Sequence, residues 1–320
     1  MKLFFSIIIP VYNRPKEVDE LLLSITNQNF KDNFEVIIVE DGSLETSENI
    51  VSKYKASLNI NYFFKENSGA GASRNFGMQK AKGNYFIVLD SDVILPEDYL
   101  HNVKSQLSKR YTDAFGGPDA AHKSFSIIQK AINYSMTSFL TTGGIRGKKI
   151  SFGKFQLRSF NLGLSKIAFE KTQGFSNMKT GEDIDLTFRL WESNFETQLI
   201  ESAFVYHKRR TSIKQFFNQT FAFGTARPIL NRKYPKSSKL TFWFPSLFII
   251  GFSFSVLMAL FNYLTLFSFF YLYFLVLLVD SIFKNGIIVG FVSILTTLIQ
   301  FFGYGLGFIK SQFLENKIFS

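Results

Sequence analysis

Short apolar runs alternate with stretches of helical spacing along the first 90 residues of the chain. Four of these runs are interpreted as strands, 4–9, 34–39, 59–64 and 85–89, and the five unbroken apolar residues at 85–89 are typical of a strand buried on both faces. Apolar residues recur at helical spacing in the three stretches between them: 17–27, 47–55 and 72–80. This alternation predicts an α/β fold with a mostly parallel sheet and right-handed crossovers.

The pattern is less regular from residue 99 to residue 159, where a helix is expected at 125–140 and a mobile loop at 141–154. The elements expected beyond this region are a strand at 160–164, helices at 166–172 and 181–193, and a last strand at 196–205 that closes with Tyr206 and His207. Pro10 stops the first apolar run, and no small-residue cleavage site follows. We therefore interpret that run as a strand and not as a signal peptide.

The character of the chain changes after His207. Residues 208–239 contain nine Lys or Arg and no Asp or Glu. Aromatic residues lie at helical spacing beside this charge, at Phe216, Phe217 and Phe221. The pattern predicts a basic amphipathic helix on an anionic membrane surface, with an ordinary surface helix as the alternative.

Three apolar stretches follow, 242–261, 264–279 and 286–309, and each is a candidate membrane span. Asp280 and Lys284 are the only charges between residues 242 and 309, and Gly303 and Gly307 form a GxxxG pair that favours close helix contact. The basic run before the first stretch predicts a cytoplasmic N-terminal domain and a multi-pass protein of the cell membrane. Two spans or a re-entrant segment stay open beside three spans, because Lys310 and Lys317 oppose an external C-terminus.

The expected organisation is a domain at 1–207, an interfacial segment at 208–240, a membrane region at 241–310 and a tail at 311–320. The formal net charge of +11 favours phosphate, lipid headgroups or nucleic acid as partners. Nucleic acid is not expected, since the basic residues adjoin a membrane stretch instead of a base-reading element. The absence of cysteine excludes disulfides, thiol nucleophiles and cysteine zinc sites.

The strand at 85–89 ends in Asp90-Ser91-Asp92. Open α/β sheets bind their ligands beyond the carboxyl ends of the strands, so two carboxylates at this edge indicate a binding site. Oxygen ligands of this kind suit Mg²⁺ or Mn²⁺, which usually hold substrate phosphates. His207, at the end of the last strand, is a third candidate ligand.

Two further motifs carry chemistry. Gly69 and Gly71 open a helix after a strand, where backbone N–H groups and Arg74 favour a diphosphate. The Gly-x-Gly also resembles a dinucleotide fingerprint, but it lacks the third glycine and follows the third strand, so no nicotinamide or flavin is expected. Glu182 and Asp183 begin another helix, and a carboxylate beside an acceptor hydroxyl is a candidate general base.

Five segments together resemble the ordered signature of glycosyltransferase family 2, which has the GT-A fold. They are Ser6 to Asn13, Val36 to Ser43, Gly71 to Asn75, Asp90 to Asp92 and Gly181 to Asp183. The resemblance covers about residues 4 to 225. It implies site residues in four groups: Pro10, Tyr12, Glu40, Asp41, Arg74 and Asp90 for the nucleotide-sugar, Asp92, Asp90 and His207 for the metal, Asp183 as catalytic base, and Gly117, Asp119, Asn161 and Glu182 for the acceptor. The chain departs from the family at Glu40, where many members carry aspartate.

The resemblance implies an inverting, metal-dependent transferase that moves a sugar from a nucleoside diphosphate, with UDP adopted as the family's commonest carrier. The expected acceptor is a lipid-linked glycan, and membrane lipids are further partners. A polyprenyl-phosphate acceptor, as in dolichyl-phosphate-mannose-synthase-like enzymes, and a non-catalytic scaffold stay open as alternatives. A processive synthase is disfavoured, because such enzymes typically carry a Gln-x-x-Arg-Trp motif and neither Gln215 nor Gln219 begins one.

Overall fold

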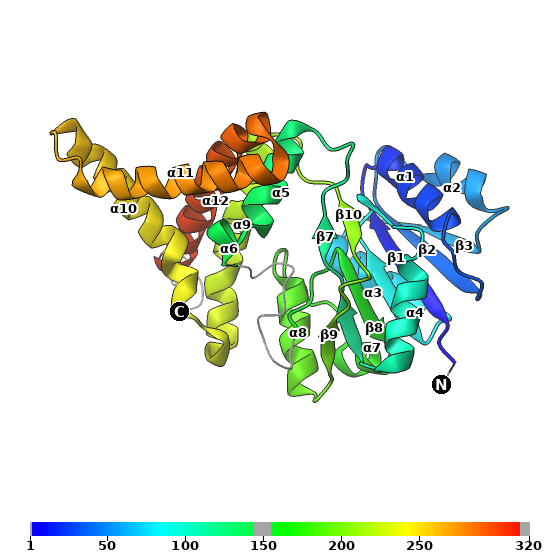
Figure 1. Cartoon of the computed structure of the whole chain (residues 1–320). Coiled ribbons are helices and arrows are strands. Elements are labelled where there is room, and N and C mark those ends of the chain that lie inside the picture. The colour runs from blue at the N-terminus through cyan, green and yellow to red at the C-terminus, as the bar shows by residue number, and fades with distance from the viewer. Residues whose placement is uncertain (1, 144–154, 314–320) are drawn as a thin grey trace. The chain divides into compact units, whose positions relative to one another are not determined.

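The structure is a computed structural model, and it describes residues 2–143 and 155–313. These residues form two compact units. The sheet unit takes its residues from Met1–His122 and Lys149–Lys208, and the helical unit from Lys123–Lys148 and Arg209–Ser320. Figure 1 shows the strands gathered in the first and the long C-terminal helices in the second. The helical unit thus includes a segment that interrupts the sheet unit in the chain, whereas one domain over residues 1–207 was proposed from the sequence.

The described part of the sheet unit contains one sheet of seven strands, in the order β3-β2-β1-β4-β8-β6-β9. Their bounds are β1 Phe5–Val11, β2 Phe34–Asp41, β3 Ile60–Lys65, β4 Tyr85–Leu89, β6 Ala114–Gly116, β8 Asn161–Ser165 and β9 Thr197–Leu199. The first four strands are parallel, as predicted, and β8 is antiparallel to both of its neighbours. A second sheet, in the order β5-β10-β7, contains β5 Val93–Ile94, β7 Asp119–Ala120 and β10 Val205–His207.

Helices cover both faces of the larger sheet. They are α1 Pro15–Thr26, α2 Glu48–Tyr54, α3 Ala70–Lys80, α4 Tyr99–Lys109, α7 Lys166–Thr172 and α8 Glu182–Glu192. Ile7 and Ile9 of β1 pack in one apolar core with α1, α2 and α4, whereas Ile8 packs in the other with α3, α7 and α8. Burial on both faces explains why β1, β2 and β4 are mostly apolar. The predicted α/β class is confirmed.

Three details of the prediction are wrong. The strand expected at 196–205 is two strands in different sheets, because the chain turns between them with a bond from Ala203 N to Ile200 O. The helix expected at 125–140 breaks at Ser138, whose side chain caps the short helix that follows. Helix α4 lies in a region predicted to be irregular. Most of the loop expected at 141–154 lies outside the described residues.

The helical unit contains α5 Ile127–Thr137, α6 Phe139–Thr142, α9 Ile213–Lys233, α10 Phe244–Leu260, α11 Thr265–Asn285, α12 Ile287–Phe313 and two short 3₁₀ turns, Pro235–Ser237 and Leu240–Trp243. Three helices within the described residues are long and apolar enough to cross a membrane: Leu240–Leu260, Thr265–Asn285 and Ile287–Phe313. Many large apolar side chains on α10 and α11 are exposed, Phe254, Phe269 and Leu272 among them. Contiguous apolar surface of this kind is typical of helices in contact with lipid.

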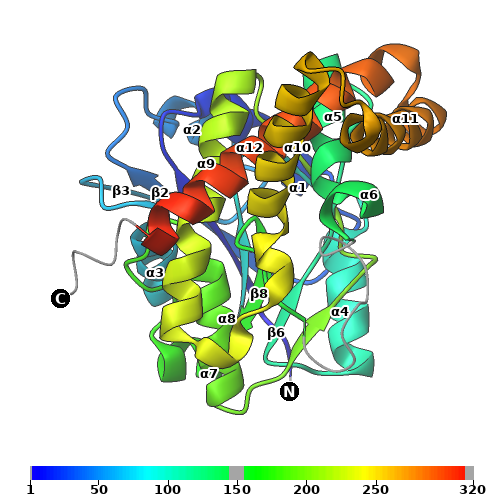
Figure 2. The same ribbon diagram turned by 90° about the vertical axis from the view of Figure 1, so that its left-hand side faces the viewer.

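Helices α9 and α12 lie side by side, as Figures 1 and 2 show. A Cβ atom on Gly307 would lie 2.2 Å from the carbonyl oxygen of Phe221, and one on Gly303 would lie 2.1 Å from Thr220 Oγ1. The two glycines therefore let the backbones approach, which confirms the close contact predicted for this pair. Phe216 is fully buried against Ile132 and Met136 of α5. The prediction that its ring lies on a membrane surface is wrong.

This interface predicts different responses to two alanine substitutions in the helical unit. Gly307→Ala should lower the stability of the protein by about 1–3 kcal/mol, because the added methyl overlaps backbone that cannot move aside. Gly251→Ala in α10 is the matched control, since its Cβ would meet only the ring of Phe270, at 3.5 Å. Both changes raise helix propensity equally. Thermal unfolding in detergent should show a lower midpoint for Gly307→Ala alone, and equal midpoints would contradict the assigned interface.

Candidate active site

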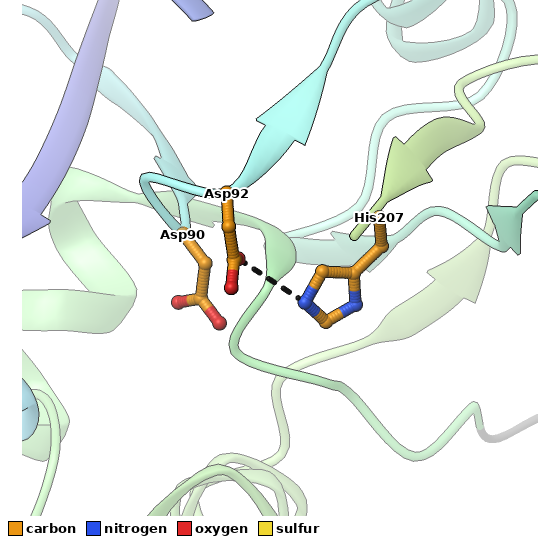
Figure 3. A group of neighbouring side chains, drawn as sticks. All are labelled: Asp90, Asp92 and His207. Atoms are coloured by element: carbon orange, nitrogen blue, oxygen red, sulfur yellow. Dashed lines mark ion pairs between the residues drawn. The ribbon is translucent and has the colours of Figure 1, made fainter. Parts of the chain in front are cut away.

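A cluster of two carboxylates and one imidazole lies beyond the end of β4 (Figure 3). Asp90 follows β4 directly, and Asp92 precedes β5. Strand β10 pairs antiparallel with β5 so that His207 lies opposite Val93, which brings the imidazole beside Asp92. His207 Nε2 lies 3.3 Å from Asp92 Oδ1, and one ligand atom from each of the three residues lies within 4.8 Å of the others. Residues 115 positions apart in the chain thus form one group.

The donor set fits a divalent cation. Carboxylate oxygens suit Mg²⁺ and Mn²⁺, and a histidine imidazole is the commonest metal ligand in proteins. Asp92 Oδ1 and His207 Nδ1 are buried and have no hydrogen-bond partner among the described residues, and the imidazole is held by stacking on Phe160, with ring centroids 4.7 Å apart. Burial would raise the pKa of the Asp92 carboxyl, but His207 and Arg14 outweigh it and hold that pKa well below its usual range. Asp92 is therefore ionised and available to a metal.

Arg14 also belongs to this site, although the sequence analysis did not select it. The residue lies in the loop after β1, and its Nη1 donates to Asp92 Oδ2 in a direct ion pair. Nε2 of His207 faces Oδ1 of Asp92, and the guanidinium therefore holds the other carboxylate oxygen, Oδ2. The signal in the sequence that could have identified Arg14 was its place directly after Asn13, at the end of a signature segment. Only the fold brings this loop to the end of β4.

Arg74 holds two of the acids together. Its side chain is buried, Nη2 donates to Asp90 Oδ1 at 2.7 Å and Nη1 donates to Glu182 Oε1 at 2.9 Å. The guanidinium also lies over the ring of Phe175, 5.1 Å from its centroid. Burial raises the pKa of the Glu182 carboxyl, and neighbouring Asp183 adds to the rise, against the opposing effect of Arg74. Arg74 thus links the end of β4 to the start of α8 and faces acidic groups that a diphosphate would compete with.

Asp183 lies in the first turn of α8, far from the Asp90 motif in the sequence. Gly181 precedes the helix with a φ of 85°, a conformation that favours glycine and lets the chain turn sharply into α8. Asp183 Oδ1 accepts a bond of 2.8 Å from Ile184 N, and Oδ2 accepts one of 3.3 Å from Ser159 N. Backbone groups thereby orient a half-buried carboxylate without a salt bridge to a basic side chain among the described residues.

The two acids at the end of β2 differ in their surroundings. Asp41 accepts bonds from the backbone N–H of Ser68 and of Gly69, both at 2.9 Å, and pairs with Lys65. Burial raises the pKa of Asp41, but these hydrogen bonds outweigh it and the net pKa is lowered. Glu40 is fully buried, and its carboxylate accepts from Ser43 Oγ, Ser47 N and Tyr62 Oη. The longer acid therefore braces the loop after β2.

The remaining predicted site residues are scattered. Tyr12 is 52% exposed, which leaves its ring accessible, whereas Pro10 is buried within β1. Asn161 is fully buried: its Oδ1 accepts from Tyr99 Oη at 2.6 Å and its Nδ2 donates to Ala203 O at 2.8 Å. A Cβ on Gly117 would lie 1.9 Å from Ala203 O. Asp119 is half-buried in β7, where it pairs with Val205. In this structure Asn161 and Gly117 thus both lie against the backbone of Ala203.

The sequence model of glycosyl transferase family 2 matches residues 6–169. The poly(ribitol-phosphate) beta-N-acetylglucosaminyltransferase TarS of Staphylococcus aureus is 34% identical over 112 residues, which are 34% of this chain and 20% of TarS. The chondroitin synthase of Pasteurella multocida is 26% identical over 237 residues, which are 63% of this chain and 24% of that enzyme. The aligned part of the chain thus spans a quarter or less of the length of either relative.

Solved structures share the fold. Residues 1–349 of S. aureus TarS match with a TM-score of 0.51 and 22% identity, over 69% of this chain and 64% of that one. The mannosyltransferase PcManGT from Pyrobaculum calidifontis, in complex with GDP-Man and Mn²⁺, matches with a TM-score of 0.56 and 15% identity, over 72% of this chain and 65% of that one. At these identities the likeness shows a GT-A-like fold for the sheet unit. Since the family model accounts for just over half of the chain, the protein belongs to glycosyl transferase family 2.

Proposed function

We propose that the protein is a membrane-anchored, inverting sugar transferase that uses a nucleoside-diphosphate sugar and a divalent metal. The observation that carries this proposal is the convergence of Asp90, Asp92 and His207 at the end of β4. Asp183 supplies a separate carboxylate, oriented by backbone N–H groups, at the start of α8. A protein that only bound nucleotide-sugar would have no need of a base.

Mg²⁺ or Mn²⁺ would be held by Asp92, Asp90 and His207, and when bound it would supply positive charge opposite the leaving diphosphate. Support for a metal comes from the buried Asp92 Oδ1 and His207 Nδ1, which lack a hydrogen-bond partner among the described residues although Oδ1 lies 3.3 Å from His207 Nε2, and from the Mn²⁺ in the complex of PcManGT. For the nucleoside, Asp41 and the exposed ring of Tyr12 offer a hydrogen-bond acceptor and a stacking surface. UDP is proposed because TarS is known in complexes with UDP and UDP-GlcNAc.

Asp183 would take the proton of an acceptor hydroxyl, and the resulting oxygen would attack the anomeric carbon from the face opposite the diphosphate. The bond from that carbon to the diphosphate breaks, and its electron pair leaves with the nucleoside diphosphate. One displacement without a covalent enzyme intermediate inverts the configuration. Arg74, released from Glu182 or Asp90 when the donor binds, would meet the diphosphate with charge-assisted hydrogen bonds.

The proposed acceptor is a lipid-linked glycan, because three helices of membrane-spanning length and composition follow the sheet unit in the chain. The basic residues between 208 and 239 support a cytoplasmic sheet unit in the cell membrane. Within the same reaction, a polyprenyl phosphate is the second acceptor to test. The interfacial role of residues 208–240 remains part of this proposal.

Donor hydrolysis by the full chain in detergent micelles tests the reaction. UDP-, GDP- and dTDP-sugars are offered with Mn²⁺ or Mg²⁺, and EDTA and Asp92→Ala serve as controls. Slow release of one nucleoside diphosphate that needs metal and Asp92 is expected, and addition of lipid-linked glycan or polyprenyl phosphate should accelerate it. Release that survives EDTA and Asp92→Ala would overturn the metal assignment.

Asp183→Asn should lower sugar transfer by about 10²- to 10⁴-fold, the usual contribution of a general base. Donor affinity should change little, because the amide keeps the size of the side chain and the diphosphate contacts lie on other residues. Transfer rates and donor titrations measure the two effects separately. Glu192→Gln, an exposed position on the same helix, is the control, and equal turnover in both variants would rule out Asp183 as the base.

Arg14→Gln should bind Mn²⁺ about tenfold more tightly than the parent chain, a change that corresponds to about 1.4 kcal/mol. The reason is that the guanidinium occupies one oxygen of Asp92 and repels a cation at that carboxylate. Electron paramagnetic resonance of free Mn²⁺ reports the affinity without any turnover. Arg14→Lys, which keeps the charge, should resemble the parent, and weaker Mn²⁺ binding by Arg14→Gln would show that Arg14 organises the site instead of competing for it.

A further inference from the structure

An ion pair lies within the long apolar helices of the helical unit. Asp280 and Lys284 are the only charged residues between positions 241 and 309. They lie one turn apart on α11, and Lys284 Nζ is 2.8 Å from Asp280 Oδ1 and 2.9 Å from Oδ2. Ionisable groups in membrane-spanning segments are costly and are a default indication of a functional site. The reaction proposed for the sheet unit does not use this pair.

The ion pair has an inner and an outer member. Tyr134 Oη of α5 donates to Asp280 Oδ2 at 2.7 Å, so the carboxylate is tied to a neighbouring helix. The side chain of Lys284 is 58% exposed, against 29% for that of Asp280. Asp280, on the inner side, therefore neutralises part of the charge of Lys284, whose ammonium group lies on the outer side.

Lys284 lines a hollow of about 320 Å³ between α5, α6 and the end of α11. The described residues that line it are Asn133, Tyr134, Thr137, Ser138, Phe139, Lys284 and Asn285, and none of them is acidic. Asn133 Oδ1 accepts two bonds from Arg209, at 3.2 and 3.0 Å, which leaves Nδ2 as the polar group that this side chain can offer elsewhere. The Asp280 carboxylate is not in the lining, but it is bonded to Tyr134 Oη and Lys284 Nζ, and one N–H of Asn285 donates to Ser281 O at 3.4 Å. The donors that the lining still offers are the ammonium and the amide N–H groups, and a set of donors without a carboxylate of its own favours an anion over a cation.

The level of the hollow along the membrane helices favours a lipid as the source of that anion. Helix α11 has 21 residues, or about 31 Å at 1.5 Å per residue, close to the thickness of the hydrocarbon core. Lys284 and Asn285 lie in its last turn and hence at the level of the lipid phosphates. Phe139 and Phe283 are 70% and 85% exposed there, as expected for rings that contact acyl chains.

We propose that this hollow binds the phosphate group of a membrane lipid, with Lys284 as the charged contact and the amides of Asn133 and Asn285 as hydrogen-bond donors. Basic pockets between membrane helices recognise lipid headgroups by this chemistry. Both a phospholipid and a polyprenyl phosphate carry the required group. The site lies entirely on residues of the helical unit, and it is independent of the proposed transfer reaction.

Native mass spectrometry of the full chain in lipid-free detergent tests the site, with phosphatidylglycerol, undecaprenyl phosphate and inorganic phosphate titrated separately. Lys284→Gln should weaken binding of the lipid about fivefold, the effect of one basic residue near a lipid surface. Asp280→Asn should strengthen it, because the lysine loses its internal partner. Lys310→Gln, at the end of α12, is the matched control and should bind as the parent does.

A preference for either lipid supports the site and identifies which lipid fills it. Equal binding by Lys284→Gln and the parent, or an equal loss in Lys310→Gln, would overturn the proposal. Binding of inorganic phosphate without binding of either lipid would also overturn it. Unfolding midpoints of all variants separate a loss of the site from a loss of the fold, and Lys284→Arg should restore binding where Lys284→Gln has lost it.

Discussion

The carboxylate of Asp92 is buried, and a buried negative charge is stable only where cations or hydrogen-bond donors surround it. Two separate parts of the chain meet this requirement. The loop after β1 supplies Arg14, and the strand β10 supplies His207. The stability of this one group therefore depends on the packing of elements from both ends of the sheet unit.

Arg74 is a nearby buried charge of the opposite sign. Its buried guanidinium is a positive charge that needs acids, and it finds them in Asp90 and Glu182, which come from the end of β4 and the start of α8. Breaking a buried pair by removal of one partner costs several kcal/mol, so these contacts also hold the edge of the sheet in shape. Asp41, Asp90, Asp92 and Glu182 each have a basic partner within the sheet unit, which keeps this edge ordered.

The helical unit is stabilised by a different kind of contact. Small residues let α9 and α12 approach, since Gly224 of α9 and Gly303 and Gly307 of α12 lie against backbone of the facing helix. Hydroxyl groups add hydrogen bonds at the same depth, as between Ser135 of α5 and Thr296 of α12 at 2.6 Å. Close packing and polar contacts of this type are the means by which helices associate where lipid removes the hydrophobic drive between them. The segment that interrupts the sheet unit in the chain thus packs against α12 of the helical unit.

Period and composition alone determined the α/β class, the four parallel strands, the helices with strong spacing and the three long apolar helices, because these features depend on neighbours in the sequence. The same local signals placed Asp90 and Asp92 at a strand end and Asp183 at a helix start. The family resemblance grouped His207 with Asp90 and Asp92, but the sequence did not select Arg14, show that Glu40 and Asn161 are buried and satisfied, or divide residues 196–207 between two sheets. Those outcomes depend on strand order and register, which are set by contacts between distant segments, some of them more than a hundred residues apart, and such contacts exist only in the folded chain.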